Sequence, residues 1–245
     1  MDQPPLRIMF EILFGEFSIN TLNYYVIIQL SIFIILMIVA YLLYPRKNRY
    51  SIMRCTISFL GSPDSIRNPR GWYFFSIALI WKMLTDIPLI LYMFRHINRF
   101  SIFAAYLAIL LYGISVLSGI IVGLFPDKEK NHTNGNFFKD LRIGMVHNVA
   151  AVLSLGASML ANLIIGIFYI VNPYTRSFSQ WIPPLVIYIV AVIGLFWSQI
   201  KWQGKLKRNK KLNPWPGKGL YSLPLWEWTV FLALEVFIYW NVLII

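Results

Sequence analysis

Long apolar stretches separated by shorter polar segments dominate the pattern of this chain. Crossing the hydrocarbon core of a bilayer takes about 20 residues of helix, because each helical residue advances about 1.5 Å. Six stretches reach that length: residues 23–44, 71–94, 101–124, 144–171, 181–200 and 223–245. The pattern therefore predicts an all-α fold, with one integral membrane domain over residues 1–245 built as a six-transmembrane-helix bundle.

Shorter amphipathic segments precede and separate these spans. Near the start of the chain, apolar residues recur at helical spacing over residues 6–17, and Arg7 and Glu11 share another face of the same helix. Residues 50–60 also mix apolar and basic positions. Both segments fit helices that lie along the membrane surface, or ordered loops that cover the ends of the bundle.

Composition supports a membrane protein and narrows the class of partner. The chain is 58% hydrophobic and 13% charged, and its formal net charge is +12, whereas soluble domains carry about 25% charged residues. Because the basic residues lie in the loops, we expect anionic lipid headgroups as partners and no nucleic acid. Cys55 is the only cysteine, which excludes an internal disulfide and a cysteine-based metal site. We expect no metal and no cofactor.

The distribution of lysine and arginine predicts the orientation. The loops after the first, third and fifth spans hold 17 of these residues, against four on the other side. By the positive-inside rule the odd-numbered loops are cytoplasmic, and both termini lie on the non-cytoplasmic side. The glycosylation sequon at Asn131 favours the opposite orientation. We give the charge distribution more weight, because a three-residue match arises often by chance.

Three charged residues, Lys82, Asp86 and Glu235, fall inside predicted spans. A charge at the bilayer centre costs about 2.5–3.5 kcal/mol on insertion scales, so it normally faces the bundle interior and has a partner. Lys82 and Asp86 share a helix face at i,i+4 spacing, and a rise of about 1.5 Å per residue places Glu235 at nearly the same depth. If the second and sixth spans are neighbours, the three charges neutralise one another.

This cluster has two competing interpretations. Pro88 interrupts the helical hydrogen bonding next to Asp86, and a kinked helix can line a polar cavity. Lys82, Asp86 and Glu235 would then bind a ligand or carry an ion or proton. Alternatively, they form a structural ion pair that holds two helices together. The sequence leaves both open.

Small residues mark candidate helix contacts. Ser115, Gly119 and Gly123 recur at four-residue spacing, and the fourth span carries a similar stripe with Ser154 and Ser158. Small residues let helices approach closely in membranes. We expect these faces to pack inside the bundle, and they would also serve a homo-oligomer.

The predicted cytoplasmic rim holds the residues best suited to chemistry. His147 begins the fourth span at the level of Glu227 in the sixth, and Asp127 follows the end of the third. Histidine can act as a general base, with Glu227 orienting it through a hydrogen bond and Asp127 completing the site. Arg70 and Arg142 could hold a phosphate-bearing headgroup, because arginine forms bidentate bonds to phosphate. Whether the protein is an enzyme stays open, since no nucleophile or metal constellation is evident.

Several short motifs resemble a known family. The sequence Ile-Ser-Phe-Leu-Gly at residues 57–61, ahead of Pro69, looks like the entry motif of the family called domain of unknown function 998. A glycine-rich third span ending in Phe125-Pro126, then His147 and Ala151, is similar to the pattern of the DRAM/Sfk-type six-span proteins. That family includes lipid-remodelling proteins that act after attachment of glycosylphosphatidylinositol anchors. The resemblance implies a six-helix bundle with a polar inner rim, and lipid handling by analogy.

Three functional hypotheses follow. The first is a multi-pass membrane protein that binds or processes a lipid at a polar site on the cytoplasmic rim, with His147, Glu227 and Asp127 at its centre. The second is a small transporter or ion-coupled carrier that uses Lys82, Asp86 and Glu235. The third is a structural or assembly protein in which both polar sets only hold helices together.

Overall fold

The computed structural model describes residues 4–47, 49–53, 55–65, 67–127, 137–172, 177–208 and 219–244. Within these ranges the regular structure is entirely helical, which confirms the predicted fold class. The helices are α1 (Pro4–Phe14), α2 (Ile19–Leu42), η1 (Ile57–Phe59), α3 (Trp72–Asn98), α4 (Ile102–Leu124), α5 (Phe137–Val171), α6 (Phe178–Arg208), η2 (Gly219–Tyr221) and α7 (Leu223–Ile244).

Six of these helices, α2 to α7, are long and apolar enough to cross a membrane. In α5 and α6 the spanning parts are Val146–Val171 and Gln180–Lys201. The chain is therefore a multi-pass integral membrane protein.

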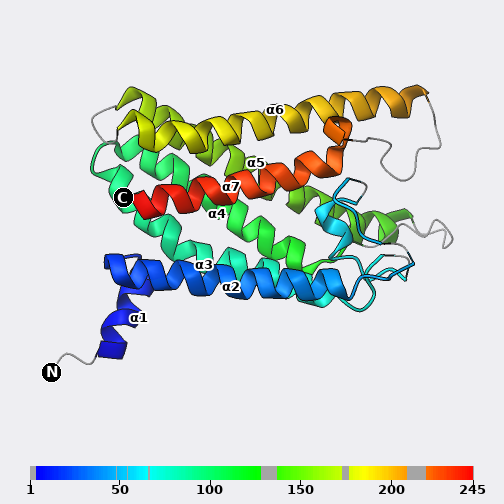
Figure 1. Ribbon diagram of the computed structural model, residues 1–245, viewed down its shortest axis with the longest axis horizontal. Coiled ribbons are helices and arrows are strands. Elements are labelled where there is room, and N and C mark those ends of the chain that lie inside the picture. Colours follow the sequence, from blue (N-terminus) through cyan, green and yellow to red (C-terminus); the bar gives the residue numbers. More distant parts are fainter. Residues whose placement is uncertain are drawn as a thin grey trace.

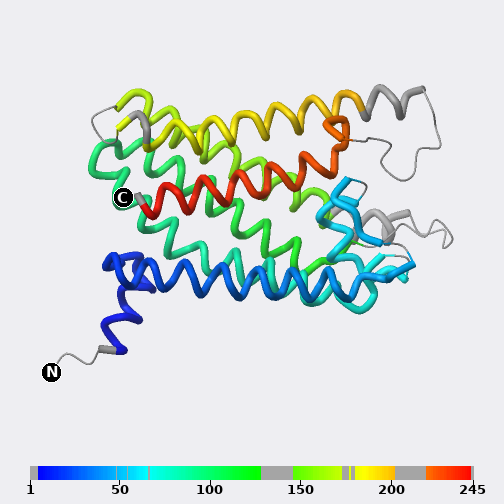
Figure 2. The backbone as a smooth tube through the Cα atoms, viewed as in Figure 1, coloured from blue at the N-terminus to red at the C-terminus, as the bar shows by residue number. Residues whose placement is uncertain are grey.

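The six helices run roughly side by side (Figure 1). Helices α2, α3, α4 and α5 pack against one another in chain order, and α6 packs against α7. Helix α7 also contacts α2, α3 and α5, which closes the bundle. The segment between α2 and α3 and the start of α7 lie at one end, which we call the rim, and α1 and the C-terminus lie at the other (Figure 2).

Helix α1 is amphipathic, as the sequence predicts. Arg7 pairs with Glu11 at 3.4 Å on one face, and the apolar side chains of Leu6, Met9, Phe10 and Leu13 are exposed. The chain then turns at Gly15, where φ is +62° and an added Cβ would lie 2.6 Å from the carbonyl oxygen of Pro88. Glycine is required there, because both the left-handed backbone and the close approach to α3 exclude a side chain.

The stripe of small residues on α4 packs inside the molecule. A Cβ at Gly119 would lie 2.5 Å from Sδ of Met83, and one at Gly123 would lie 2.7 Å from Cγ1 of Ile80, so both glycines bring α4 close to α3. Towards α5, the Ser115 hydroxyl donates to the Ser154 carbonyl at 2.9 Å, and the Ser154 hydroxyl donates to the Ser115 carbonyl at 3.0 Å. The stripe therefore joins α3, α4 and α5 within one chain, as expected for close packing in a membrane.

One buried asparagine holds the rim segment, residues 43–71 between α2 and α3, in place through hydrogen bonds. Asn68 is 0% exposed, and its Nδ2 donates to the carbonyls of Ala40 at 3.0 Å and Leu60 at 2.8 Å. Its Oδ1 accepts from the backbone N–H of Gly71 at 3.1 Å. A single side chain thus joins the end of α2, the η1 turn and the start of α3.

Two further bonds attach the rim segment to α7. The indole N–H of Trp228 donates to the Tyr50 hydroxyl at 2.7 Å, and the Ser222 hydroxyl donates to the carbonyl of Met53 at 2.7 Å. The η1 turn is therefore held between α2, α3 and the beginning of α7, and this fixes the position of the polar groups at the rim.

Candidate functional site

A cavity lies between α3, α4, α5 and α7. Its accessible volume is about 90 Å³, so it is a narrow space with room for several water molecules. Most of its lining is apolar. Its polar lining residues come from the rim and from the middle of the bundle, and they are Ser58, Glu227, Asp86, Glu235, Tyr112, Ser115, Ser154 and Ser158. The two polar regions that the sequence singled out therefore face the same space.

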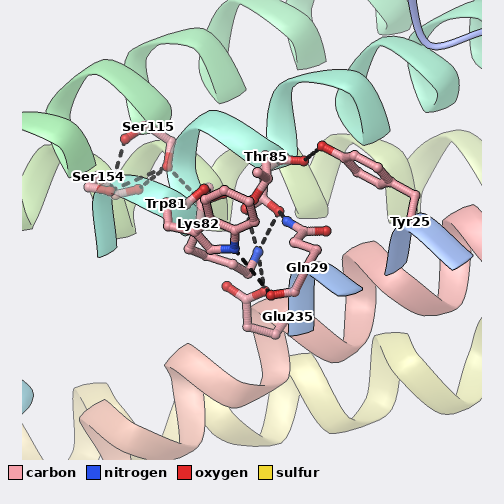
Figure 3. Close-up of polar contacts among 10 residues, drawn as sticks. Tyr25, Gln29, Trp81, Lys82, Thr85, Ser115, Ser154 and Glu235 are labelled. Carbon is pink, nitrogen blue, oxygen red and sulfur yellow. Dashed lines mark hydrogen bonds and ion pairs between the residues drawn. The ribbon is translucent and has the colours of Figure 1, made fainter. Parts of the chain in front are cut away.

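The mid-bundle cluster, which we define as Lys82, Asp86 and Glu235, forms as the depth estimate predicts. The Lys82 Nζ lies 2.5 Å from both carboxylate oxygens of Asp86 and 2.6 Å from Oε2 of Glu235. In Figure 3, Glu235 on α7 points toward Lys82 on α3. The second and sixth spans, α3 and α7, are neighbours, so the condition under which the three charges neutralise one another is met, and Lys82 is 0% exposed.

A glutamine on α2 donates a further hydrogen bond to Asp86. Gln29 is 1% exposed, and its Nε2 donates to Oδ1 of Asp86 at 2.7 Å (Figure 3). The backbone carbonyl of Gln29 also accepts from the indole N–H of Trp81 at 3.3 Å. Sequence reasoning missed this residue, although a glutamine within an apolar span is itself a signal, because a buried amide needs hydrogen-bond partners.

The turn before Pro88 also receives a bond from α2. The Tyr25 hydroxyl donates to the carbonyl of Thr85 at 2.8 Å (Figure 3), a carbonyl in the helical turn that the proline interrupts. Helices α2, α3 and α7 are thus connected by polar contacts at one level of the bundle. The buried Oε1 of Gln29, at the same level, has no hydrogen-bond partner within the described part of the chain.

The mid-bundle cluster has an uneven charge balance. With every group ionised, one ammonium faces two carboxylates, so the cluster carries a formal charge of −1. Asp86 and Glu235 also line the cavity. The middle of the cavity therefore favours a neutral or cationic group over an anion.

At the rim, His147 is almost fully buried and both of its ring nitrogens have partners. Nδ1 lies 2.7 Å from the carbonyl oxygen of Phe125, and since a carbonyl only accepts, Nδ1 carries the proton and donates it. In the neutral ring Nε2 is then an acceptor, and it lies 3.3 Å from the Ser58 hydroxyl oxygen. The hydrogen bond expected between Glu227 and His147 does not form, because other groups occupy both nitrogens.

Glu227 has a different role from the one expected. Its carboxylate has a hydrogen bond with the backbone of Ile57, the first residue of η1. It also lines the cavity. Glu227 thus holds the turn that carries Ser58, and does not orient the imidazole.

Asp127 forms an ion pair. Its Oδ2 lies 2.6 Å from Nη1 of Arg67, and the Arg67 guanidinium lies 4.2 Å from the ring centre of Phe59. This contact attaches the rim segment to the end of α4. Asp127 therefore supports the rim from outside the cavity lining.

Arg70 and Arg142 are the two arginines expected to hold a headgroup. Arg70 is exposed at the start of α3, where a phosphate could reach it. The side chain of Arg142 and the sequon at Asn131 lie outside the described residues. Among the described residues, no group of three or more histidine, cysteine, aspartate or glutamate side chains could hold a metal ion.

Ser58 is the residue at the rim that sequence reasoning did not assign to the site. It belongs to the Ile-Ser-Phe-Leu-Gly motif, but a serine in a loop carries no chemical signal of its own. Only the fold brings it to His147, 89 positions further along the chain.

The chain was compared with known proteins. No family model matches it, and neither a curated protein nor a solved structure matches it. The resemblance to domain of unknown function 998 and to the DRAM/Sfk-type proteins stays a prediction, and the function has to be argued from the site itself.

Proposed function

We propose that this membrane protein binds a lipid in the cavity between α3, α4, α5 and α7. One observation carries the proposal: a single cavity with mostly apolar walls joins the polar rim at Ser58 and Glu227 to the polar level at Asp86 and Glu235. Apolar walls with a few placed polar groups are typical of sites for amphiphilic ligands. The hydrocarbon part of a lipid would lie along the apolar walls and its polar part near the rim.

Electrostatics restrict where the headgroup lies. Three carboxylates line the cavity, those of Glu227, Asp86 and Glu235, so a phosphate inside it would meet like charges. An anionic headgroup would instead stay outside, at the basic rim where Arg70 is exposed. Inside the cavity, groups that donate hydrogen bonds, such as hydroxyl or ammonium, fit the carboxylates better.

A pair of neighbouring positions on α5 tests lipid binding. Ala151 lines the cavity, whereas Val152 is 72% exposed on the outer surface. The variant Ala151→Phe should fill the cavity and reduce the lipid that co-purifies with the protein, measured by native mass spectrometry of protein released from nanodiscs. The matched control Val152→Phe should retain it. Equal amounts of bound lipid in both variants would contradict the proposal.

A second candidate function is an ion-coupled carrier. It is favoured by the position of Asp86 and Glu235, because these two ionisable groups line the cavity in mid-membrane. Under this hypothesis Glu235→Gln changes uptake, or the pH dependence of uptake, in proteoliposomes. If the variant changes only the thermal stability, the cluster is structural.

We propose that the rim faces the cytoplasm, following the distribution of lysine and arginine. The exposed residues Arg70, at the rim, and Arg99, at the opposite end, allow a test in a Cys55→Ala background. A membrane-impermeant maleimide applied to intact cells should label Arg99→Cys and leave Arg70→Cys unlabelled until the cells are permeabilised. The reverse pattern would invert the orientation.

A further inference from the structure

The contact between Ser58 and His147 has the geometry of a nucleophile and its general base. The carbonyl of Phe125 takes the proton of His147 Nδ1 at 2.7 Å and thereby holds the ring in the tautomer with a free lone pair on Nε2. That lone pair lies 3.3 Å from the Ser58 hydroxyl oxygen. A serine hydroxyl next to a histidine that a third group orients is the arrangement that activates a nucleophile.

The location of Ser58 makes this contact relevant to a ligand. Ser58 lines the cavity, while His147 is 1% exposed behind it. A ligand in the cavity would therefore meet the serine, and the histidine would be shielded from bulk water. A separation of 3.3 Å is long for a hydrogen bond, and such contacts commonly tighten only when substrate is present.

The surrounding fold fixes the serine. Its turn, η1, is held on one side by the bond between Glu227 and the backbone of Ile57. On the other side, Asn68 donates to the carbonyl of Leu60 at 2.8 Å. Glu227 and Asn68 are thus positioning residues, because each acts on Ser58 through the backbone.

We propose that Ser58 is a nucleophile, activated by His147, that accepts the acyl group of a carboxylic ester of the lipid bound in the cavity. This inference rests on the proposed lipid binding and extends it to a substrate class, acyl esters of membrane lipids. The apolar cavity walls hold the acyl chain, and the rim holds the ester where Ser58 reaches it.

The reaction balances with groups on this chain and one water molecule. Oγ of Ser58 bonds to the ester carbonyl carbon while its proton moves to Nε2 of His147. The bond from that carbon to the leaving alcohol oxygen then breaks, and the alcohol takes the proton from Nε2. In the second half, a water attacks the acyl-serine carbon and gives a proton to Nε2, which returns it to Oγ as the carboxylic acid is released. A second alcohol in place of the water would give acyl transfer.

The test uses the full-length protein in native membranes and a fluorophosphonate carrying a long alkyl chain, a probe that reacts with activated serines. The wild type should be labelled, and both Ser58→Ala and His147→Gln should reduce the labelling rate roughly 100-fold or more, the scale of general base catalysis. The control Ser51→Ala removes a hydroxyl from the same rim segment, where it accepts from the backbone N–H of Met53 at 3.3 Å, and should be labelled like the wild type. Equal labelling of His147→Gln and wild type would overturn the inference.

Lipid content measured on the same preparations separates this inference from the proposed function. Ser58→Ala should lose labelling and keep its bound lipid, because the hydroxyl adds little to the apolar contact area. If the wild type binds lipid and is not labelled, the nucleophile is wrong and lipid binding stands. If Ala151→Phe and Val152→Phe hold equal lipid while Ser58 is still labelled, the lipid site is wrong and the activated serine stands.

Discussion

The mid-bundle cluster borders the cavity through Asp86 and Glu235, and the rim pair, Ser58 and His147, borders it through Ser58; the two meet different physical demands. In the cluster, Lys82 Nζ lies 2.5 Å from Asp86 and 2.6 Å from Glu235, so the one ammonium forms an ion pair with each carboxylate. In the rim pair, Nδ1 of His147 lies 2.7 Å from the carbonyl oxygen of Phe125 and Nε2 lies 3.3 Å from the Ser58 hydroxyl oxygen, so directional hydrogen bonds orient the ring. The groups that are most costly to bury are paired with one another, whereas the rim pair makes a single directional contact.

The physical reason lies in the desolvation cost. An ion in mid-membrane has to be paired before the helix is stable, and a paired ion has little capacity left for a ligand. A neutral serine and histidine cost less to bury once hydrogen-bonded, and they keep a lone pair and a proton available.

The largest effect should follow loss of Lys82, the buried cation of the mid-bundle cluster. Lys82→Met leaves two carboxylates facing each other in mid-membrane, and we expect a loss of about 3–5 kcal/mol in the free energy of unfolding. The measurement is reversible unfolding in mixed micelles. Replacing all three charges by Lys82→Met, Asp86→Leu and Glu235→Leu should recover most of the lost free energy of unfolding, because apolar side chains of similar size fill the same space. A triple variant as unstable as Lys82→Met would show that the charges do more than balance one another.

The next effect concerns the anchor of the rim. Asn68→Ala leaves the carbonyls of Ala40 and Leu60 and the N–H of Gly71 without their partner, and we expect a cost of about 1–3 kcal/mol. The rim segment should also exchange its amide hydrogens faster, while amides around Lys82 stay protected. Hydrogen exchange with mass spectrometry measures both regions in one experiment. Equal loss of protection in the two regions would mean that rim and cluster unfold as one unit.

A smaller effect is expected from the ion pair that supports the rim. Both side chains of the Arg67–Asp127 pair are partly exposed, at 16% and 19%, so Asp127→Asn should cost about 1 kcal/mol or less. The loss should shrink further at high salt, because ions screen exposed pairs. Thermal unfolding of the wild type and Asp127→Asn at two salt concentrations checks this, and a cost that does not depend on salt would argue against a solvent-accessible pair.

The smallest effect is confined to alkaline pH. Burial raises the pKa of the Tyr44 phenol from 10.0 to about 12, and burial likewise raises the pKa of Tyr50 above its ordinary range. Folding keeps these phenols protonated, so their contribution is fully present below pH 10 and is lost as the pH rises toward 12. The rim should therefore loosen over that interval while the cluster stays intact. Tyrosinate absorbance with hydrogen exchange measures it, and Tyr44→Phe should weaken the pH dependence. Loosening that begins below pH 10 would point to another group.

Much of the fold could be predicted from the sequence because the bilayer imposes a simple length requirement. The apolar stretch at residues 101–124 predicted α4 within one residue of its start. Depth along a helix also follows from sequence, since each residue advances about 1.5 Å. That is why the meeting of Lys82 and Asp86 with Glu235 was predictable once the two helices were assumed to be neighbours.

The contact between Ser58 and His147 could not be predicted from the sequence. His147 contacts Phe125 and Ser58, which lie 22 and 89 positions away in the chain, and the spacing in the sequence says nothing of how two helices rotate against each other. The prediction of a hydrogen bond between Glu227 and His147 was wrong for that reason. The two residues lie at a similar depth along their helices, but Glu227 bonds to the backbone of Ile57.

The sequence by itself therefore determined that this protein crosses a membrane six times, and it determined the depth at which its charges lie. Hydrophobic length and helical rise are local quantities, readable one segment at a time. Only the tertiary structure decided that α3, α4, α5 and α7 enclose one cavity and that a serine on η1 faces the free nitrogen of His147. Those features depend on which helix faces which, and close packing of small residues such as Gly119 against α3 sets that arrangement.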